Sequence, residues 1–251
     1  MIKLAISGCA GKMGSRILSL AFADKEFEVV AALETKGHPS IGSKLGNIKI
    51  TDDIEAIKLA DCLIEFTSPE ATIAHIETCS RLKKSIVIGT TGLNDQQKNI
   101  ISDLAKNVAI VFSPNLSIGV NLLFRLVQEA AHKLPGYSVK IIEAHHVQKK
   151  DAPSGTAKQL AQVIKDSTAK NVSDIQSIRE GEIIGDHEVI FDSPYDTIKL
   201  VHSAKTRDIF AQGALTAAKF LAGKKTGLFS MQDVLENLAK LDYEEKLFND
   251  I

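Results

Sequence analysis

The chain has 251 residues, 44% of them hydrophobic and 24% charged, which is long enough for two domains and excludes an intrinsically disordered protein. Its 30 basic and 31 acidic residues give a formal net charge of -1, which excludes the global basic field of a protein that binds nucleic acid or an anionic membrane. The three cysteines lie in apolar or helical patterns, not in the framework of a secreted disulfide protein, so we expect a cytoplasmic protein.

The N-terminal half alternates apolar strands with helices. Runs typical of buried parallel strands are "IKLAIS", "FEVVAAL", "DCLIEF", "SIVIGT" and "AIVFSP", and the first helix begins near Met13. A second helix is expected after the cap Ser68, with Pro69 in its first turn. This order predicts an α/β fold with a doubly wound, Rossmann-like parallel sheet.

One stretch imitates a membrane span, because no charged residue occurs from Asn107 to Phe124. It contains the turn signal "SPN", however, so we expect a strand, a loop and a helix start there. The protein is therefore not expected to contact a membrane.

The pattern changes near Val120. A helix "NLLFRLVQEAAHKL", a strand "SVKIIEAHH", a helix after Ser154 and the alternating strands "HEVIFDS" and "DTIKLVHSA" predict a second, α+β domain with a mixed sheet. The last stretch, "GALTAAKFLAGKKTGLFSMQDVL", is helical and then loop-like, and could return to the first domain. We expect residues 1–116 with 207–251 as one domain and 117–206 as the other.

The first motif is "GCAGKMG", from Gly8 to Gly14, directly after a strand and at the start of a helix. In that setting glycines permit a tight turn and let backbone N–H groups approach a pyrophosphate at the positive helix end. Cys9 could have a lowered thiol pKa at this helix start, although a small residue that fits the turn is the simpler interpretation.

A carboxylate follows the next strand. Glu34 lies 20 residues beyond Gly14, at about the distance where a carboxylate meets the ribose hydroxyls of NAD. Lys36 could instead contact a 2′-phosphate, so NADH and NADPH both remain open. A solvated strand end is the alternative interpretation of Glu34.

Three further loops follow strands at the edge where a doubly wound sheet binds its ligand. They are "FTSPEAT", "GTTG" from Gly89 to Gly92, and "SPNLS". Each has small or amide residues that can line a nicotinamide.

The segment "EAHHVQKKDAPSGTA" gathers His145, His146, Lys149 and Lys150 before a helix start. Histidine titrates near neutrality and a lysine among other cations can also donate a proton, so this segment predicts proton donors for a developing charge. If Ser154 caps the following helix, the N–H groups at its start are placed for an anion such as a carboxylate.

The histidines do not predict a metal site. Two adjacent histidines lack a third ligand at HxxxH or CxxC spacing, so no metal is expected. The remaining histidines lie singly and carry no predicted role: His38, His75, His132, His187 and His202.

Over nearly its whole length the chain resembles the 4-hydroxy-tetrahydrodipicolinate reductase (dihydrodipicolinate reductase) family. The resemblance rests on "GCAGKMG", "EFTSPEAT", "GTTG", "SPNLSIGVN", "EAHHVQKKDAPSGTA", "REGEIIGDHEV" and "FAQGALTAAKFLAGKKTGLFSMQDVL", in that order. It implies an NADH- or NADPH-dependent enzyme that reduces a small cyclic dicarboxylate in lysine and diaminopimelate biosynthesis. The outer domain would bind the dinucleotide, and the middle domain would bind substrate and build a homotetramer.

The resemblance also implies roles for individual residues. His145 would be the proton donor or acceptor and Lys149 the second proton donor, and the substrate would be held by His146, Gly155 and Thr156. The dinucleotide would be held by Gly8, Cys9, Ala10, Gly11, Lys12, Met13, Glu34, Gly89, Thr90, Thr91, Ser113, Pro114, Asn115 and Leu116.

The chain departs from the family at one of these places. The family often has an arginine directly after the ribose acid, and Thr35 stands there, which leaves a preference for NADPH open. Two other functions fit the same fold: a dinucleotide-binding sensor without catalysis, and a dehydrogenase acting on another small amino diacid.

Overall fold

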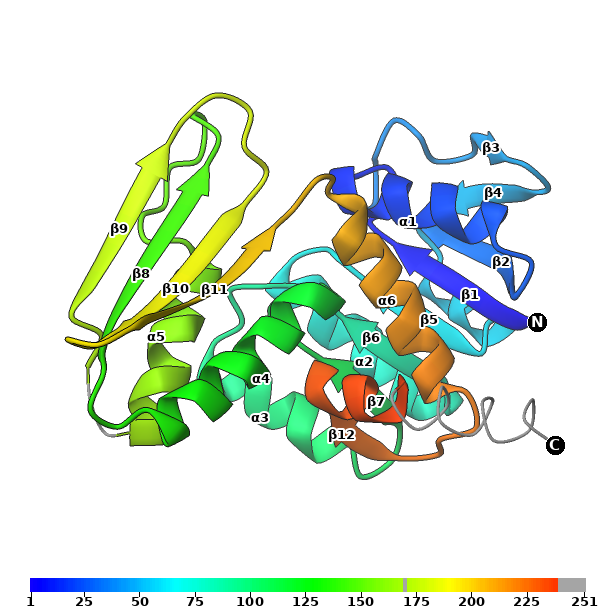
Figure 1. The fold of residues 1–251 in the computed structure, drawn as a ribbon. Helices are drawn as coiled ribbons and strands as arrows, with labels where there is room; N and C mark the ends of the chain where they lie inside the picture. The colour runs from blue at the N-terminus through cyan, green and yellow to red at the C-terminus, as the bar shows by residue number, and fades with distance from the viewer. Residues whose placement is uncertain (169–170, 239–251) are drawn as a thin grey trace, which may run out of the picture. The chain divides into compact units, whose positions relative to one another are not determined.

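The computed structural model describes residues 1–168 and 171–238 (Figure 1). The chain forms two compact units, one of Met1–Ser117 with the segment from Phe210 onward, and one of Ile118–Ile209. The part of the expected first domain at residues 239–251 lies outside the described residues.

The first unit contains a sheet in the order β12-β7-β6-β5-β1-β2-β4-β3. Neighbouring strands pair in parallel except β3 with β4, which confirms the doubly wound parallel sheet. The strands are β1 (Ile2–Ser7), β2 (Phe27–Leu33), β3 (Lys44–Leu45), β4 (Ile48–Thr51), β5 (Cys62–Glu65), β6 (Ser85–Ile88), β7 (Ala109–Phe112) and β12 (Gly227–Phe229).

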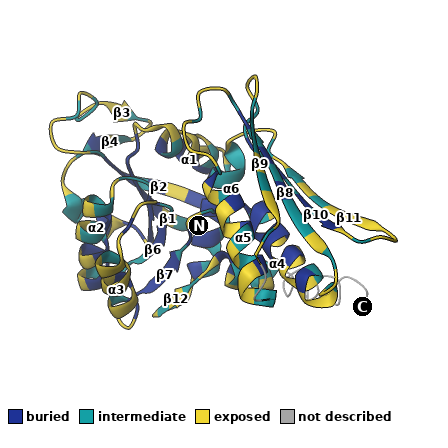
Figure 2. Cartoon of the chain, turned by 90° about the vertical axis from the view of Figure 1, so that its left-hand side faces the viewer, coloured by how far each residue is buried: buried dark blue, intermediate teal, exposed yellow. Residues whose placement is uncertain are grey.

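Helices cover both faces of this sheet. Helices α1 (Lys12–Ala23) and α6 (Asp208–Leu221) lie on one face, and α2 (Pro69–Leu82) and α3 (Asp95–Leu104) on the other (Figures 1 and 2). A 3₁₀ helix (Ile54–Leu59) precedes β5. The apolar sides of α2 and α3 bury Ile76, Cys79 and Ile101 against the sheet, so this face forms a continuous core.

The cap of α2 is the one predicted from the sequence. The Ser68 side chain accepts a hydrogen bond from the Ala71 N–H, and Pro69 occupies the first turn of α2. Asn94 and Gln97 form a capping box at the start of α3. These caps fix where the helices begin and thus where the preceding loops end.

The C-terminal stretch differs in detail from the expectation. Helix α6 begins at Asp208, before Gly213, and "GLF", expected to be loop, is strand β12. Gly227 pairs with Ala109 of β7, so the stretch joins the sheet of the first unit. A strand this short has too few residues to show a periodic pattern.

The second unit contains a mixed sheet in the order β11-β10-β8-β9, as predicted for this half. Its strands are β8 (Ser138–His145), β9 (Asp174–Arg179), β10 (Asp186–Asp192) and β11 (Thr197–Ser203), and only β8 and β9 pair in parallel. The polar sequence of β9 did not suggest a strand.

Helices α4 (Ile118–Lys133) and α5 (Gly155–Thr168) cover one face of this sheet (Figures 1 and 2). Ile141, Val189 and Phe191 point toward them and are fully buried. Because side chains alternate across a strand, Glu143 and His145 of β8 point to the same face as Ile141. The core of this unit therefore becomes polar where β8 ends.

No helix within the described residues is long and apolar enough to cross a membrane. The uncharged stretch at 107–124 contains β7, a loop and the start of α4, as the "SPN" signal predicted.

Candidate functional site

The glycine loop joins β1 to α1 in the first unit. Gly8 has a positive φ of 69°, and a Cβ there would lie 2.8 Å from the Phe66 carbonyl oxygen. A Cβ on Gly14 would lie 2.1 Å from the Gly8 carbonyl oxygen, so the loop can fold onto the helix only if both residues are glycine. The N-cap of α1 is Gly11, which has no side chain to satisfy the amides of the first turn.

Glu34 follows β2 and lies beside the glycine loop. Its carboxylate accepts hydrogen bonds from the Ala10 N–H at 3.0 Å and from the Thr35 N–H at 2.9 Å. It is therefore more than a solvated strand end. A pocket of about 420 Å³ opens beside it, lined by Ser7, Leu33, Glu34, Thr35, Lys36, Asp52, Ile54, Thr67, Ser68, Ala71, Ala74 and His75.

The loops after β5 and β6 contact each other. A Cβ on Gly89 would lie 2.4 Å from the Phe66 ring, so the ring packs against the backbone of Gly89. The Thr90 hydroxyl accepts a hydrogen bond from the Thr67 N–H at 3.2 Å. Parallel strands β5 and β6 end at the same edge of the sheet, and the loops that follow them contact each other there.

The loop after β7 is held by α6. A Cβ on Gly213 would lie 1.7 Å from the Leu116 carbonyl oxygen, so the helix backbone packs directly on the loop. The Ser113 hydroxyl donates to the Asn115 carbonyl at 2.7 Å and stabilises the turn. Pro114 is exposed between them.

Glu65, at the end of β5, was missed from the sequence. It is fully buried, and its carboxylate binds the His75 Nδ1 at 2.5 Å as well as the Thr67 hydroxyl. His75 also lines the pocket beside Glu34. A glutamate inside an apolar strand, with a histidine on the following helix, was the only sequence signal for this pair.

The first unit fits a dinucleotide. The glycine loop folds tightly against α1, the first turn of α1 presents its amides, and Glu34 stands beside a pocket of about 420 Å³. The thiol pKa of Cys9 is not lowered at this helix start, because burial and then the charge of Glu34 raise it to about 11. The simpler interpretation of Cys9 is therefore the better one.

In the second unit His145 ends β8 and is 8% exposed. Its Nδ1 lies 2.5 Å from the Glu143 carboxylate, which is fully buried. Arg179 of β9 binds both oxygens of that carboxylate, at 2.8 and 3.1 Å. Burial lowers the pKa of His145, and the hydrogen bond and charge of Glu143 oppose that shift.

The loop after His145 carries the predicted lysine. Lys149 is mostly buried and forms an ion pair with Asp151 at 2.8 Å, while His146 follows the strand end and is half-buried. The charge of Lys149 lowers the pKa of His145, so the two groups are close enough to interact. The structure thus brings both expected proton donors together.

Ser154 caps α5 as predicted, since its hydroxyl accepts a hydrogen bond from the Ala157 N–H at 3.2 Å. Around Gly155 the space is open, with nothing within 4 Å of a Cβ built there. Gly155 and Thr156 form the first turn of the helix, where backbone N–H groups favour an anion.

His187 of β10 was not assigned from the sequence but belongs to this cluster. Its ring meets the His145 ring edge to face at 5.3 Å, and its Nε2 lies 3.2 Å from the Ser154 hydroxyl. Burial, and then the charge of His145, lower the pKa of His187 to about 4. Its Nδ1 and that of His202 are buried without a hydrogen-bond partner among the described residues.

Metal ligands were not expected, and the described residues contain no group of three or more His, Cys, Asp or Glu side chains placed to hold an ion. The polar clusters of both units are instead built from carboxylate–histidine pairs, hydroxyls and backbone amides.

Comparison with known proteins gives two family matches. Residues 2–116 match the family described as dihydrodipicolinate reductase, N-terminus, and residues 119–235 match dihydrodipicolinate reductase, C-terminus. Two similar relatives are 4-hydroxy-tetrahydrodipicolinate reductases. The Nitrosomonas eutropha protein is 41% identical, covering 94% of this chain and 98% of its own, and the Burkholderia multivorans protein is 39% identical, covering 93% and 99%.

Among solved structures, the dipicolinate-bound dihydrodipicolinate reductase of Paenisporosarcina sp. TG-14 has a TM-score of 0.80 at 27% identity, covering 92% of this chain and 97% of its own. Aspartate dehydrogenase of Thermotoga maritima has a TM-score of 0.54 at 12% identity and shares the fold alone.

The fold, the glycine loop and these relatives define the class: an oxidoreductase that uses a nicotinamide dinucleotide. Within that class, the chain belongs to the dihydrodipicolinate reductase family.

Proposed function

We propose that the chain reduces 4-hydroxy-tetrahydrodipicolinate to tetrahydrodipicolinate with NAD(P)H, in lysine and diaminopimelate biosynthesis. Family membership gives the reaction, and one observation in this structure carries it: His145, Lys149 and the start of α5 gather around one end of the second sheet. A dicarboxylate requires cationic or N–H groups, and a reduced imine requires a proton. This cluster supplies both.

The first unit would hold the dinucleotide. Gly8 to Met13 and the start of α1 would bind the pyrophosphate, and Glu34 the adenosine ribose. The loops at Gly89–Thr91 and Ser113–Leu116, which end neighbouring strands, would line the nicotinamide. When bound, the reduced nicotinamide supplies the hydride.

The second unit would hold the substrate and move protons. Gly155 and Thr156 would bind a carboxylate at the start of α5, and His146 would contact the substrate beside them. Lys149 would donate one proton. His145 keeps its Nδ1 on Glu143, so its Nε2 is the atom that would exchange a proton with the substrate.

The cofactor preference follows from the pocket beside Glu34. Two carboxylates, Glu34 and Asp52, and one cation, Lys36, line it. Carboxylates bind ribose hydroxyls and repel a 2′-phosphate, whereas Lys36 would attract that phosphate. We propose that both cofactors are used and that NADH binds more tightly.

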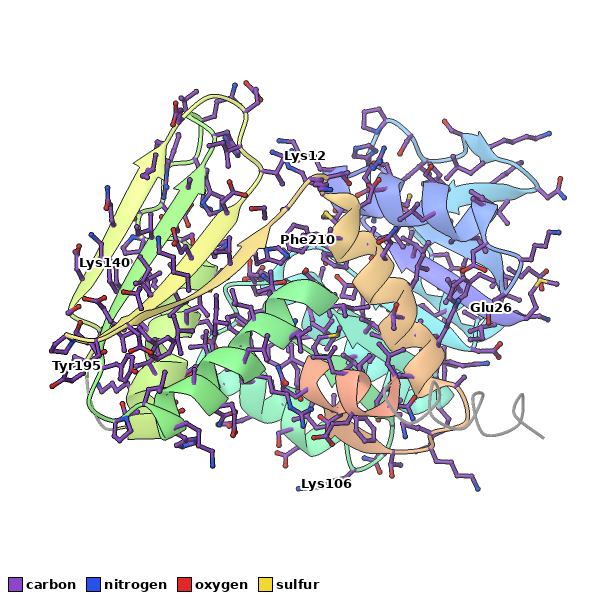
Figure 3. The ribbon with its side chains drawn as sticks, in the orientation of Figure 1. Lys12, Glu26, Lys106, Lys140, Tyr195 and Phe210 are labelled. Atoms are coloured by element: carbon purple, nitrogen blue, oxygen red, sulfur yellow. The ribbon has the colours of Figure 1, made fainter. Side chains whose placement is uncertain are left out.

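A homotetramer would form through the open face of the second sheet. Side chains alternate between the two faces along each strand, so the residues between the core positions point outward. The apolar residues at these outward positions are Ile142, Ile178, Ile190 and Val201. The ion pairs Lys140–Asp174 and Glu188–Lys199 lie on the same face, where Glu188 is paired with Ile142 and Val201 and Lys140 with Ile190. Lys140 projects from the sheet and Tyr195, 96% exposed, marks the tip of the β10–β11 hairpin (Figure 3).

The three buried cysteines are free thiols, which favours a reducing compartment, and we propose the cytoplasm.

The deciding experiment follows the absorbance of NADH and of NADPH in parallel, with substrate generated enzymatically in the cuvette. We expect both to be oxidised, with the lower KM for NADH. Binding of NADH without oxidation would point to a dinucleotide sensor. Turnover on a linear amino diacid and none on the cyclic substrate would show a different dehydrogenase.

A further inference from the structure

Glu143 is a buried carboxylate of the second unit that is bonded on both oxygens. One oxygen lies 2.5 Å from the His145 Nδ1 and accepts from Arg179 at 3.1 Å. The other accepts from Arg179 at 2.8 Å and from the Ser154 N–H at 3.2 Å. We call Glu143, His145, Ser154 and Arg179 the Glu143 cluster.

The charge state of Glu143 fixes the proton on His145. Burial raises the pKa of Glu143, but hydrogen bonds from Arg179, Ser177, His145 and the Ser154 N–H outweigh it and hold the pKa at about 2. An ionised carboxylate only accepts hydrogen bonds, so the His145 Nδ1 must carry a hydrogen. The Nε2 is left as the exchanging atom.

Space is kept open at that atom. Gly185 lies beside it, and a Cβ at this position would come within 3.1 Å of the His145 Nε2. Gly185 does not have a positive φ, so the close approach to His145 is the structural reason for a glycine here.

The same carboxylate holds two other parts of the proposed substrate site. Through the Ser154 N–H it fixes the residue that caps α5. Through Arg179, which donates to the Asp151 carbonyl at 2.5 Å, it is connected to the loop where Asp151 pairs with Lys149.

We propose that Glu143 is a positioning residue for the reduction: its buried charge sets the tautomer of His145 and, with Arg179, fixes the start of α5 and the Lys149 loop. The inference rests on the proposed function of this site. Glu143 acts through its neighbours, since both of its oxygens are occupied by protein donors and the residue is 0% exposed.

The expected pH dependence follows from the groups that face His145. Glu143 favours the protonated ring, while burial, Lys149 and Arg179 disfavour it. The His187 ring also faces His145, at 5.3 Å between ring centroids. Removing the charge of Glu143 would therefore lower the pKa of His145. If the protonated His145 ring is the proton donor, activity falls as the pH rises through the pKa of His145. In a variant without the Glu143 charge, this fall would occur at a lower pH than in the unmodified protein.

The test compares Glu143→Gln with Glu129→Gln, which changes an exposed glutamate on α4 of the same unit. We expect Glu143→Gln to lower kcat by about 10²- to 10⁴-fold, the usual contribution of a general acid. The dissociation constant for NADH should stay unchanged, and the inflection of kcat with pH should move to lower pH. Glu129→Gln should behave like the unmodified protein. A lowered kcat with an unmoved inflection would reduce Glu143 to a structural role and overturn the proposal.

A second measurement does not depend on the folding of the Glu143→Gln variant. In protein labelled with ¹⁵N-histidine, nitrogen shifts and couplings identify which ring nitrogen of His145 carries hydrogen, and His145→Gln assigns the signal by its loss. We expect Nδ1–H in the unmodified protein above the pKa of His145. A neutral ring with Nε2–H would overturn the proposal. Failure of the unmodified protein to oxidise NAD(P)H would instead reject the proposed function, since the tautomer is read without substrate.

Discussion

His187 should make the second unit sensitive to acid. Its pKa is about 4 in the folded chain, against an ordinary value of 6.5, because burial and then the charge of His145 oppose its protonation. Since the folded pKa is depressed, the contribution to stability is complete above pH 6.5 and is lost as the pH falls from 6.5 toward 4. At 1.36 kcal/mol per pKa unit, the loss across this window is roughly 3 kcal/mol.

The perturbation is His187→Gln, with the exposed His132→Gln as its control. The variant also weakens the contact between His187 and the Ser154 hydroxyl, so we expect it to be about 1 kcal/mol less stable near pH 7. Near pH 4.5 it should be the more stable protein, because it has no imidazole to protonate. The acid-sensitive groups that do not interact with His187 are present in both proteins and cancel in the comparison.

The assay is urea unfolding at a series of pH values, followed by circular dichroism because the chain has no tryptophan. We expect the free energy of unfolding of the unmodified protein to fall by roughly 2 to 3 kcal/mol more than that of His187→Gln between about pH 7 and pH 4.5. Parallel curves for the two proteins would refute the reasoning, since they would mean that His187 is not held neutral by burial.

Four further outcomes test the proposed sites. Gly14→Ala should lose about 1 to 3 kcal/mol of stability, measured by calorimetry, and should bind the dinucleotide more weakly in a titration, because its Cβ would lie 2.1 Å from a backbone oxygen. In the control Gly136→Ala the Cβ meets open space, so stability and dinucleotide binding should both stay unchanged. Lys36→Ala should raise the KM for NADPH but leave that for NADH unchanged; equal effects would contradict a 2′-phosphate contact. Ile190→Lys should reduce the molar mass measured by light scattering, and an unchanged tetramer would exclude this face of the sheet. His145→Gln should lower turnover by about 10²-fold or more with NADH affinity kept, so loss of NADH binding would argue against separate roles for the two units.

Much of the first unit could be predicted because its signals are local. The strand, glycine loop and helix at Gly8–Gly14 are adjacent in sequence, and a Cβ on Gly14 would meet the nearby Gly8. A Cβ on Gly8 would meet Phe66, which is distant in sequence. The cap at Ser68 is equally local. Strand β12 was missed because its three residues gain their structure from pairing with the distant β7.

Only part of the polar site in the second unit could be predicted, because only some of its residues are close together in the sequence. His145, Lys149 and Ser154 share one segment, and a capped helix start is readable from sequence. Arg179 and His187 reach the cluster through strand register, since Arg179 pairs with His145 across β9 and β8, and His187 pairs with Glu143 across β10 and β8. No spacing along the chain encodes that register. A polar strand such as β9 is also hard to predict, because its inward residues Ser177 and Arg179 contact the polar cluster and only Ile175 packs against the apolar core.

Both units use one device to hold a functional loop: a fully buried glutamate with a histidine Nδ1 at 2.5 Å, Glu65 with His75 and Glu143 with His145. A buried carboxylate costs several kcal/mol unless donors satisfy it, so the loops that supply those donors are penalised for moving away. Thr67 supplies such a donor for Glu65, and the Ser154 N–H does so for Glu143. Apolar packing alone would tolerate small displacements of either loop, whereas a directional hydrogen bond to a buried charge does not. The polar interior thus gives each loop a defined position, which is what binding a dinucleotide or placing a proton donor requires.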